Sequence, residues 1–324
     1  MEESKIEIVK YPKVKHIKIF VNKINYVENH IHNDIELFVV LNGKGSIKLN
    51  SVEQSFSVGD MFLINSGDVH SLSSFVEEAG QLSEGSTSLF IQISNHFVKE
   101  YFPKIRTLMF ESVNLKNVLK EEDYHRMLSL LVYAAGYYFS ESNYFQLDIV
   151  ADITKALAIL LKNVKYEILN DAQKMRMQKQ QRRLERIISY IDDNFDLKIK
   201  LDDIAEKENL SLTYLSHLFT SNFGMSFQEF INVKRMEQSI RLMTNKEKTL
   251  LEISLESGFS DPKYMNKIFL KKFGCTAKEY RKKYSMVVEE SELKTGKLEV
   301  IYNDSISLKK IEEFAKQFRL RFMN

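Results

Sequence analysis

The feature that most constrains the fold of this chain is a pattern that occurs twice between Asp202 and Tyr284. The first copy runs from Ile204 to Gly224, and the second runs from Ile253 to Gly274. The copies keep the same order of Ile, Asn/Gly, Leu/Phe, Ser, Phe and Phe-Gly positions, apart from one residue inserted between Ser260 and Met265. Such internal similarity indicates a duplicated structural unit.

Each copy has the pattern of a short helix, a tight turn and a second helix. Asn209 and Gly258 fall at the turns, where a left-handed backbone favours these residue types, and Ser211 and Ser260 are then the predicted N-caps. Apolar residues at helical spacing predict the buried face of each second helix: Leu215, Leu218, Phe219 and Phe223 in the first copy, and Met265, Ile268, Phe269 and Phe273 in the second. The opposite face could enter a DNA major groove, which is the helix-turn-helix arrangement; an ordinary helical bundle is the alternative.

The region between and around the copies fits this interpretation. Residues 226–243 are predicted to form one helix, which would hold two DNA-reading helices roughly one DNA turn, about 34 Å, apart. Its predicted buried residues are Phe227, Phe230, Ile231 and Met236. The net charge of the chain is only +2, yet residues 263–283 hold eight Lys or Arg and one acidic residue. This excess suits phosphate neutralisation, although a solvated helix face would also explain it.

Longer motifs make the comparison with a family specific. The first half contains D-D-I-A, S-x-x-Y-L-S-x-L-F and F-G-M-S-F-x-E-F-I, and the second contains I-S-L-E-S-G-F-S-D and F-L-K-K-F-G-C-T-A-K-E-Y-R. With these motifs, residues 182–284 resemble the DNA-binding domain of the AraC/XylS family of transcription regulators. Two positions depart from the family pattern: Ala277 replaces a proline, and Pro262-Lys263 stand where many members have polar pairs. The resemblance implies binding to double-stranded promoter DNA and contact with RNA polymerase.

Alignment on the family also indicates which side chains face the DNA. The predicted DNA-binding residues are Thr213, Ser216 and His217 in the first copy, and Pro262, Lys263, Asn266, Lys267, Lys271 and Lys272 in the second. Lysine suits guanine and asparagine suits adenine, whereas Lys271 and Lys272 are expected at phosphates. Because residues 211–224 contain neither Lys nor Arg, we predict that the second copy contributes more to recognition.

The N-terminal part has the pattern of a sheet protein. Apolar, β-rich runs occur at residues 14–21, 35–41, 46–49, 61–64 and 89–93. Turn signals separate them at Asn42-Gly43, Asn50-Ser51, Gly59-Asp60 and Ser66-Gly67. Many short strands of this kind predict a double-sheet jelly roll or small barrel, which can hold one small ligand.

Two motifs in this part, H-I-H-N-D-I-E and G-D-M-F-L-I-N-S-G-D-V-H, resemble the paired motifs of the cupin superfamily. The matching residues are His30, His32, Glu36 and His70, whereas Asn65 and Ser74 replace a usual proline and asparagine. In cupins such residues can surround Mn, Fe, Ni or Zn, which imidazole and carboxylate ligands suit. The resemblance to AraC/XylS regulators implies that these histidines line the barrel, where they bind an organic effector or form hydrogen bonds across strands. We therefore expect an effector site here, with a metal site as the less favoured alternative and with no cofactor.

The middle of the chain is expected to be helical. A helix broken near Pro103 is predicted over residues 95–110, and two apolar helices over 121–141 and 145–169. These two helices should pack on each other, on the barrel or on a second subunit; the family resemblance favours a homodimer, and an intramolecular hairpin is the alternative. The polar residues 170–181 are interpreted as a linker, followed by a helix over 182–194.

The predicted fold class is α+β, with five parts along the chain. These are a cupin-like effector barrel (1–95), a helical dimerisation segment (96–170), a linker (171–181), a double helix-turn-helix domain (182–284) and a C-terminal extension of unknown role (285–324). The extension has the pattern of a strand and an amphipathic helix that starts near Ser305 or Ser307, and a small docking element is the simplest interpretation.

Composition limits the class of protein. The single cysteine, Cys275, excludes an internal disulfide, and the chain has neither a membrane-spanning apolar run nor a signal-peptide core, so a cytoplasmic protein is expected. The family resemblance implies a transcription activator, without catalytic residues, that responds to a sugar or related metabolite. The alternative is a metal-dependent cupin enzyme fused to a DNA-binding regulator.

Overall fold

The computed structural model describes residues 9–49, 52–74, 77–78, 81–82, 85–243, 245, 247–288 and 299–320. The chain divides into two compact units, and the fold class is α+β as predicted. One unit, here called the effector unit, comprises residues 6–179 together with 299–324. The other, here called the DNA-binding unit, is formed by residues 180–298 and is helical throughout its described part.

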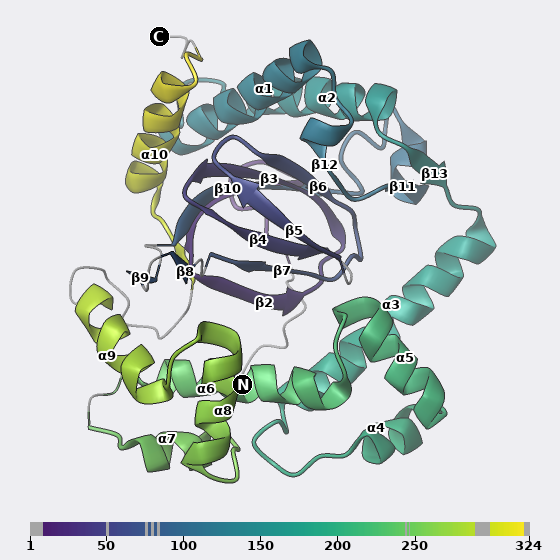
Figure 1. Ribbon diagram of the computed structural model, residues 1–324. Helices are drawn as coiled ribbons and strands as arrows, with labels where there is room; N and C mark the ends of the chain where they lie inside the picture. Colours follow the sequence, from purple (N-terminus) through teal and green to yellow (C-terminus); the bar gives the residue numbers. More distant parts are fainter. Residues whose placement is uncertain are drawn as a thin grey trace. The chain divides into compact units, whose positions relative to one another are not determined.

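Two antiparallel sheets face each other in the effector unit (Figure 1). The six-stranded sheet has the order β12 (Val113–Asn114), β6 (Met61–Ile64), β3 (Asp34–Asn42), β10 (Ser86–Ser94), β1 (Ile17–Ile24) and β14 (Glu299–Ile301). The four-stranded sheet has the order β2 (Tyr26–His30), β7 (His70–Ser73), β4 (Lys44–Leu49) and β5 (Val52–Ser57). Two small two-stranded sheets pair β8 (Glu77–Glu78) with β9 (Gln81–Leu82), and β11 (Leu108–Phe110) with β13 (Tyr166–Ile168).

The strands predicted at residues 35–41, 61–64 and 89–93 are confirmed as β3, β6 and β10. All three are buried on both faces. Phe38, Phe62 and Phe90 point into the space between the sheets, whereas their neighbours Leu37 and Ile91 belong to a second core on the outer face. Burial on both faces explains the continuous apolar runs in the sequence. Strands β2, β5 and β7 carry more polar residues, and we did not predict them.

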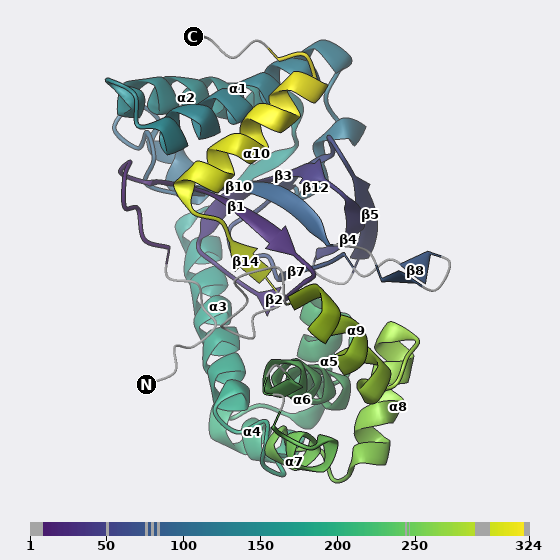
Figure 2. The ribbon, with the colours of Figure 1, turned by 90° about the vertical axis from the view of Figure 1, so that its left-hand side faces the viewer.

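Three helices cover the outer face of the six-stranded sheet (Figures 1 and 2). They are α1 (Glu121–Ser140), α2 (Phe145–Asn163) and α10 (Asp304–Gln317). The first two were predicted, but α2 ends at Asn163 rather than Leu169, because residues 166–168 pair with β11.

The prediction of a helix over residues 95–110 is wrong. These residues form turns, the short 3-10 helix η1 (Pro103–Thr107) and strand β11. Val98 has a left-handed backbone with φ of 50°, and Pro103 begins η1, so neither residue allows one continuous α-helix.

The expected start of the next helix is also corrected, since α3 (Asp171–Asp192) begins before Arg182. Asn170 and Gln173 form a reciprocal cap: each backbone N–H donates to the side-chain oxygen of the other residue, at 2.9 Å. This capping box starts the helix inside the polar stretch 170–181. That stretch is therefore helical.

The DNA-binding unit contains two helix-turn-helix copies joined by a long helix. The elements are α4 (Leu201–Glu208), α5 (Leu212–Phe223), α6 (Phe227–Met243), α7 (Leu250–Glu256), α8 (Pro262–Phe273) and α9 (Ala277–Val288). Matching aromatic clusters show the duplication in three dimensions. Phe223 and Phe230 have ring centroids 4.6 Å apart, and Phe273 and Tyr280 have the same separation.

The two turns also match. Asn209 and Gly258 both have left-handed backbones, with φ of 51° and 80°. Ser211 Oγ accepts a hydrogen bond from the N–H of Tyr214 and is the N-cap of α5, as predicted.

The predicted N-cap role of Ser260 is wrong. The N-cap of α8 is Asp261, whose Oδ1 accepts from the N–H of Tyr264 at 2.8 Å. The inserted residue in the second copy and the proline at the first turn, Pro262, move the helix start by one position.

The C-terminal extension forms the predicted strand and helix, β14 and α10, which belong to the effector unit. The N-cap of α10 is Asn303, rather than Ser305 or Ser307, because its Oδ1 accepts from the N–H of Ile306 at 3.0 Å. Among the described residues, the helices are too short or too polar to cross a lipid bilayer.

Candidate effector site and DNA-binding surface

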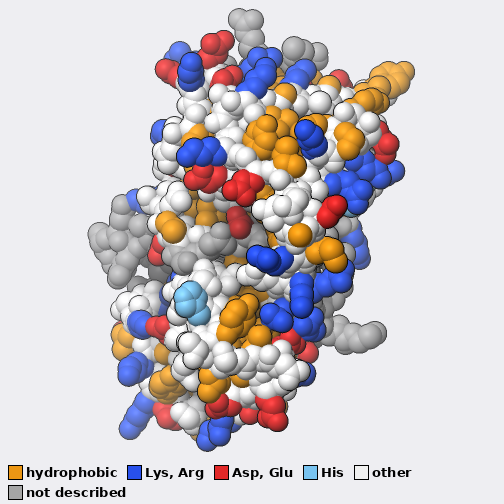
Figure 3. All heavy atoms as spheres, turned by 90° about the vertical axis from the view of Figure 1, so that its right-hand side faces the viewer, with side chains coloured by type: hydrophobic (Ala, Val, Ile, Leu, Met, Phe, Trp, Pro, Cys, Tyr) orange, Lys and Arg blue, Asp and Glu red, His pale blue; other side chains and the backbone are white. Residues whose placement is uncertain are grey.

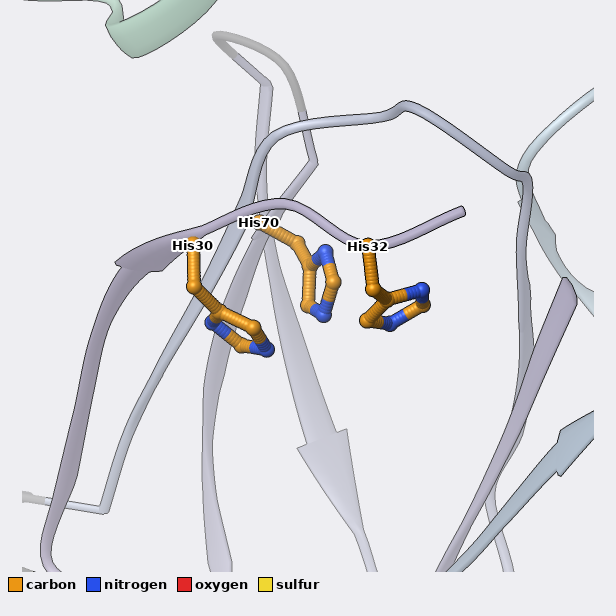
Figure 4. Close-up of side chains that lie close together, drawn as sticks. All are labelled: His30, His32 and His70. Atoms are coloured by element: carbon orange, nitrogen blue, oxygen red, sulfur yellow. The ribbon is translucent and has the colours of Figure 1, made fainter. Parts of the chain in front are cut away.

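The four cupin-like residues lie together between the two sheets. His30 ends β2, His32 follows it, Glu36 lies on β3, and His70 begins β7. Figure 4 shows the three imidazole rings side by side, with His70 between the other two. Ligand atoms of the three histidines lie within 4.8 Å of one another. Residues that the two sequence motifs single out in three separate segments thus lie together in the structure.

Backbone carbonyl groups fix the orientation of two of these rings. His32 Nδ1 lies 3.0 Å from the oxygen of Asp34, and His70 Nδ1 lies 3.0 Å from the oxygen of Asp68. A carbonyl oxygen only accepts hydrogen bonds, so each Nδ1 carries a proton. The other nitrogens face one carboxylate: His32 Nε2 is 3.3 Å and His70 Nε2 is 3.5 Å from the oxygens of Glu36.

Glu36 is the electrostatic centre of this cluster. Its burial alone would raise the pKa, but the charges and hydrogen bonds of His32 and His70 hold the pKa of Glu36 well below its usual range. Glu36 is therefore ionised at neutral pH. A buried carboxylate requires a compensating cation or donor, which a protonated imidazole, a ligand hydroxyl or a metal ion could each supply.

Gln92 is a fifth member of the site that the sequence reasoning missed. Its Nε2 donates to Glu36 Oε2 at 3.0 Å, and the two residues are directly paired across β10 and β3. The signal was present in L-F-I-Q-I, where one polar residue shares the inward register of Phe90. A buried amide in that register indicates a polar partner on the adjacent strand.

The rest of the space between the sheets is apolar and contains a cluster of phenylalanines. Phe38 packs against Phe56, Phe62 and Phe90 with ring centroids 5.1 to 5.7 Å apart, and Phe20 stacks on Phe90 at 5.0 Å. The interior thus has a charged and hydrogen-bonding end and an apolar end. A small ligand at the polar end would contact Glu36, Gln92 and the histidines.

The residues also fit the metal ion that the cupin resemblance implies. Imidazole nitrogens whose Nδ1 atoms are held by carbonyl groups are the usual metal-ligand arrangement in proteins. His30, His32, His70 and Glu36 would hold the ion, which when bound would polarise an oxygen of a ligand.

On the DNA-binding unit, Thr213, Ser216 and His217 are exposed on α5. They border a shallow surface groove between α5 and the start of α4, together with Leu201, Asp202, Leu212 and Thr220. This surface offers hydroxyl groups and one imidazole.

The corresponding surface of α8 is basic. Lys263, Lys267 and Lys271 are exposed and recur every fourth residue, which places them on one helix face. Lys272 is also exposed, whereas Pro262 is half-buried in the first turn. Lys271 Nζ lies 3.0 Å from Glu229 Oε1 at the start of α6, so this lysine already has an acidic partner.

Asn266 is placed differently from the lysines. It is half-buried, and its Oδ1 accepts a hydrogen bond from the N–H of Ala277, the first residue of α9, at 2.9 Å. A two-bond contact with adenine needs this oxygen, so the bond to Ala277 would have to break. Ala277 stands where the family pattern has a proline, which lacks an N–H, and Asn266 satisfies the N–H that Ala277 adds.

Helix α3 carries further positive charge. It holds six Lys or Arg and three acidic residues, and Figure 3 shows basic side chains gathered on the face of the molecule that carries this helix. Arg186 is partly neutralised, because it donates two hydrogen bonds to the carboxylate of Glu208, at 2.9 and 2.6 Å.

Both units of this chain match known protein families. The family model described as an AraC-like ligand binding domain matches residues 19–79, and the model described as a helix-turn-helix domain matches residues 204–283. An uncharacterised HTH-type transcriptional regulator of Escherichia coli, YdiP, is 22% identical over 288 residues, which cover 82% of this chain and 84% of the relative. The Msm operon regulatory protein of Streptococcus mutans is 23% identical over 252 residues, or 78% of this chain and 85% of the relative.

Among solved structures, ToxT from Vibrio cholerae is similar with a TM-score of 0.40 and 18% identity, covering 83% of this chain and 98% of ToxT. The two family models match in the order that the two units have in the structure. The chain thus carries a ligand-binding domain and a helix-turn-helix domain of the kinds found in AraC-type transcription regulators, in that order.

Proposed function

We propose that this regulator activates transcription when a sugar or a related polyhydroxylated metabolite binds between the sheets of its effector unit. The observation that carries the proposal is the buried carboxyl group of Glu36, which His32, His70 and Gln92 surround. Carboxylate, amide and imidazole groups can together accept from and donate to neighbouring hydroxyl groups of one ligand. The aromatic end of the interior would contact the less polar face of such a ligand.

The roles along the chain follow the division proposed from sequence. Residues 1–95 bind the effector, 96–170 form the dimer, 171–181 connect the units, and 182–284 bind DNA. Coupling requires that the effector binds two states of the protein with different affinity, and the state that it favours presents the DNA-binding units to promoter half-sites and RNA polymerase.

The effector site is tested with Glu36→Gln and His32→Ala in a cellular reporter and in DNA titrations. Glu36→Gln keeps the shape of the side chain but removes its charge, so we expect loss of the response to candidate sugars with unchanged basal DNA binding. The exposed Glu53→Gln variant in the same unit is the matched control. Retention of the full response in Glu36→Gln would contradict the proposed site.

The dimer is proposed to form through the outer face of α2. Leu147 and Val150 are 70% and 37% exposed there, and Ala151, Thr154 and Ala158 continue the same weakly polar face. Leu147→Glu should make the full-length protein monomeric in sedimentation at micromolar concentration, whereas the neighbouring Gln146→Glu should not. An unchanged dimer in Leu147→Glu would reject this face.

A metal-binding effector unit is the second candidate function. The geometry of His30, His32 and His70 around Glu36 favours it, as described above. Metal analysis of protein purified without chelators or a polyhistidine tag distinguishes the candidates. Stoichiometric Fe, Mn, Ni or Zn that is lost in His70→Gln would support a metal site, and metal-free protein that still responds to effector would exclude it.

A further inference from the structure

The chain leaves the effector unit through α3 and returns to it after the DNA-binding unit. Strand β14 is antiparallel to β1, with Val300 opposite Lys23 and Ile301 opposite Asn22. The N–H of Tyr302 then donates to the oxygen of Val21 at 2.9 Å. Residues 299–302 thus extend the six-stranded sheet at the edge strand β1.

Helix α10 contributes to the hydrophobic core of this unit. Ile311, Phe314 and Ala315 are almost fully buried in the core that includes α1 and the outer face of the sheet, and Figure 2 shows α10 lying across α1. Phe318 stacks on Phe314 at 4.3 Å, and its ring covers Gly59, where an added Cβ would lie 2.8 Å from the ring. The face under α10 is therefore shaped for this segment.

An ionic cluster fixes the start of the helix. Lys13 Nζ lies 2.7 Å from Asp304 and 2.8 Å from Glu141 at the end of α1, and it donates to the oxygen of Tyr138 at 3.1 Å. Three segments that are distant in sequence meet at one mostly buried ammonium group.

We propose that residues 299–320 are a permanent part of the effector unit and act as a second tether for the DNA-binding unit, an inference that rests on the proposed function. The ten residues 289–298 join Val288 of α9 to Glu299 of β14. An extended chain of this length reaches at most about 36–40 Å. While β14 and α10 stay docked, the end of α9 remains within that distance of the sheet.

The tether has a consequence for DNA recognition. A unit joined to its neighbour only by α3 could move widely, whereas a unit attached at both ends is restricted to a smaller set of positions. In a dimer, this restriction limits the spacing of the two DNA half-sites that can be bound together. Binding to a single half-site does not depend on it.

Docking is tested by a disulfide between Lys23→Cys and Val300→Cys in a Cys275→Ser background. Antiparallel partners have Cα atoms about 4.5–5.5 Å apart, which suits a disulfide. We expect near-complete intramolecular oxidation in full-length protein, and little for the control pair Lys23→Cys with Lys309→Cys. Equal oxidation of both pairs would overturn the docked arrangement.

The tether itself is tested by lengthening it. A Gly/Ser insertion of about 20 residues after position 293 raises the average end-to-end distance of a flexible connection from roughly 17 Å to roughly 30 Å and leaves β14 and α10 unchanged. The same insertion after Asn324 is the control. The DNA probes are duplexes that the wild-type protein enriches from a random 40-bp pool, remade with 5 or 10 bp added between their half-sites.

We expect the added base pairs to weaken wild-type and control binding at least about tenfold, and the lengthened variant markedly less, because simultaneous binding of two half-sites strengthens affinity only when the geometry allows it. Equal spacer dependence of the wild type and the lengthened variant would overturn the tether alone. Failure of the wild type to enrich any duplex would overturn the proposed DNA recognition, and the tether with it.

Discussion

Asn266 and Ala277 illustrate how a single side chain compensates for a substitution elsewhere. The oxygen of Asn266 satisfies the first N–H of α9, which a proline at 277 would lack. Asn266→Ala should lower the free energy of unfolding of the DNA-binding unit by about 1–3 kcal/mol, because it leaves that half-buried N–H without its acceptor.

A double-mutant cycle checks this explanation. In an Ala277→Pro background, Asn266→Ala should cost clearly less, since proline is favourable at the first helical position and has no N–H. Urea unfolding followed by circular dichroism gives the four free energies. An equal cost of Asn266→Ala in both backgrounds would show that the bond to Ala277 is not what Asn266 contributes.

Gln92 provides a second test at the level of a residue. Gln92→Glu would place another carboxylate against Glu36, and like charges at this distance cannot both be ionised without a large cost. We expect Gln92→Glu to lower the melting temperature of the effector unit more than the nearly isosteric, uncharged Gln92→Met. The opposite order in differential scanning calorimetry would contradict an ionised Glu36.

The resemblance to the cupin motifs singled out His30, His32, Glu36 and His70 in the sequence, and the structure brings them together. The sequence did not reveal Gln92, because strand pairing, rather than local pattern, places this amide beside Glu36. Nor did it reveal that Asn266 holds α9, since that contact depends on how two helices pack.

At the level of elements, capping decides where helices begin. Glu229 caps α6 by accepting from the N–H and hydroxyl of Ser226, and it also pairs with Lys271. These hydrogen bonds, the backbone N–H of Ser226 first, lower the pKa of Glu229 to about 2. The folded state therefore keeps this carboxylate ionised at pH values where the unfolded chain has taken up a proton.

The sign of the pH dependence follows from this difference. Glu229 stabilises the fold above its unfolded pKa, and the stabilisation is lost as the pH falls from about 4.5 to about 2. Glu229→Gln should thus flatten the decline in urea-unfolding stability of the DNA-binding unit between pH 5 and pH 3. The exposed Glu247→Gln should leave the slope unchanged, and equal slopes for wild type and Glu229→Gln would refute the capping role.

Helix existence was easier to predict than helix ends. The repeat predicted α5 and α8 because their apolar residues recur at helical spacing. The start of α3 depends on the cap between Asn170 and Gln173, which a polar composition conceals. The predicted helix over 95–110 does not form, although its local sequence favours a helix, and Val98 has a left-handed backbone there.

For the whole molecule, the order of the chain does not match the order of the units. The C-terminal segment belongs with residues 6–179, a pairing that no local pattern predicts because it joins the two ends of the chain. Phe314→Ala should therefore destabilise the effector unit by about 3–5 kcal/mol, the usual cost of removing a buried phenylalanine. The exposed Glu312→Ala is its control.

Calorimetry of the full-length protein can assign the loss to one unit. His70→Gln identifies the unfolding transition of the effector unit, and Asn266→Ala identifies that of the DNA-binding unit. Phe314→Ala should shift the first transition and leave the second unchanged. A shift confined to the DNA-binding transition would mean that α10 belongs with the other unit.

We predict that this chain recognises DNA chiefly through α8. The most direct measurement is a titration of wild type and variants on an enriched duplex and a scrambled duplex at several salt concentrations. Lys267→Ala should cost about 1–3 kcal/mol on the enriched duplex and relax base preference, while His217→Ala on α5 should cost less. Lys272→Ala should weaken both duplexes alike and reduce the salt dependence. A larger loss of specificity in His217→Ala than in Lys267→Ala would contradict the account.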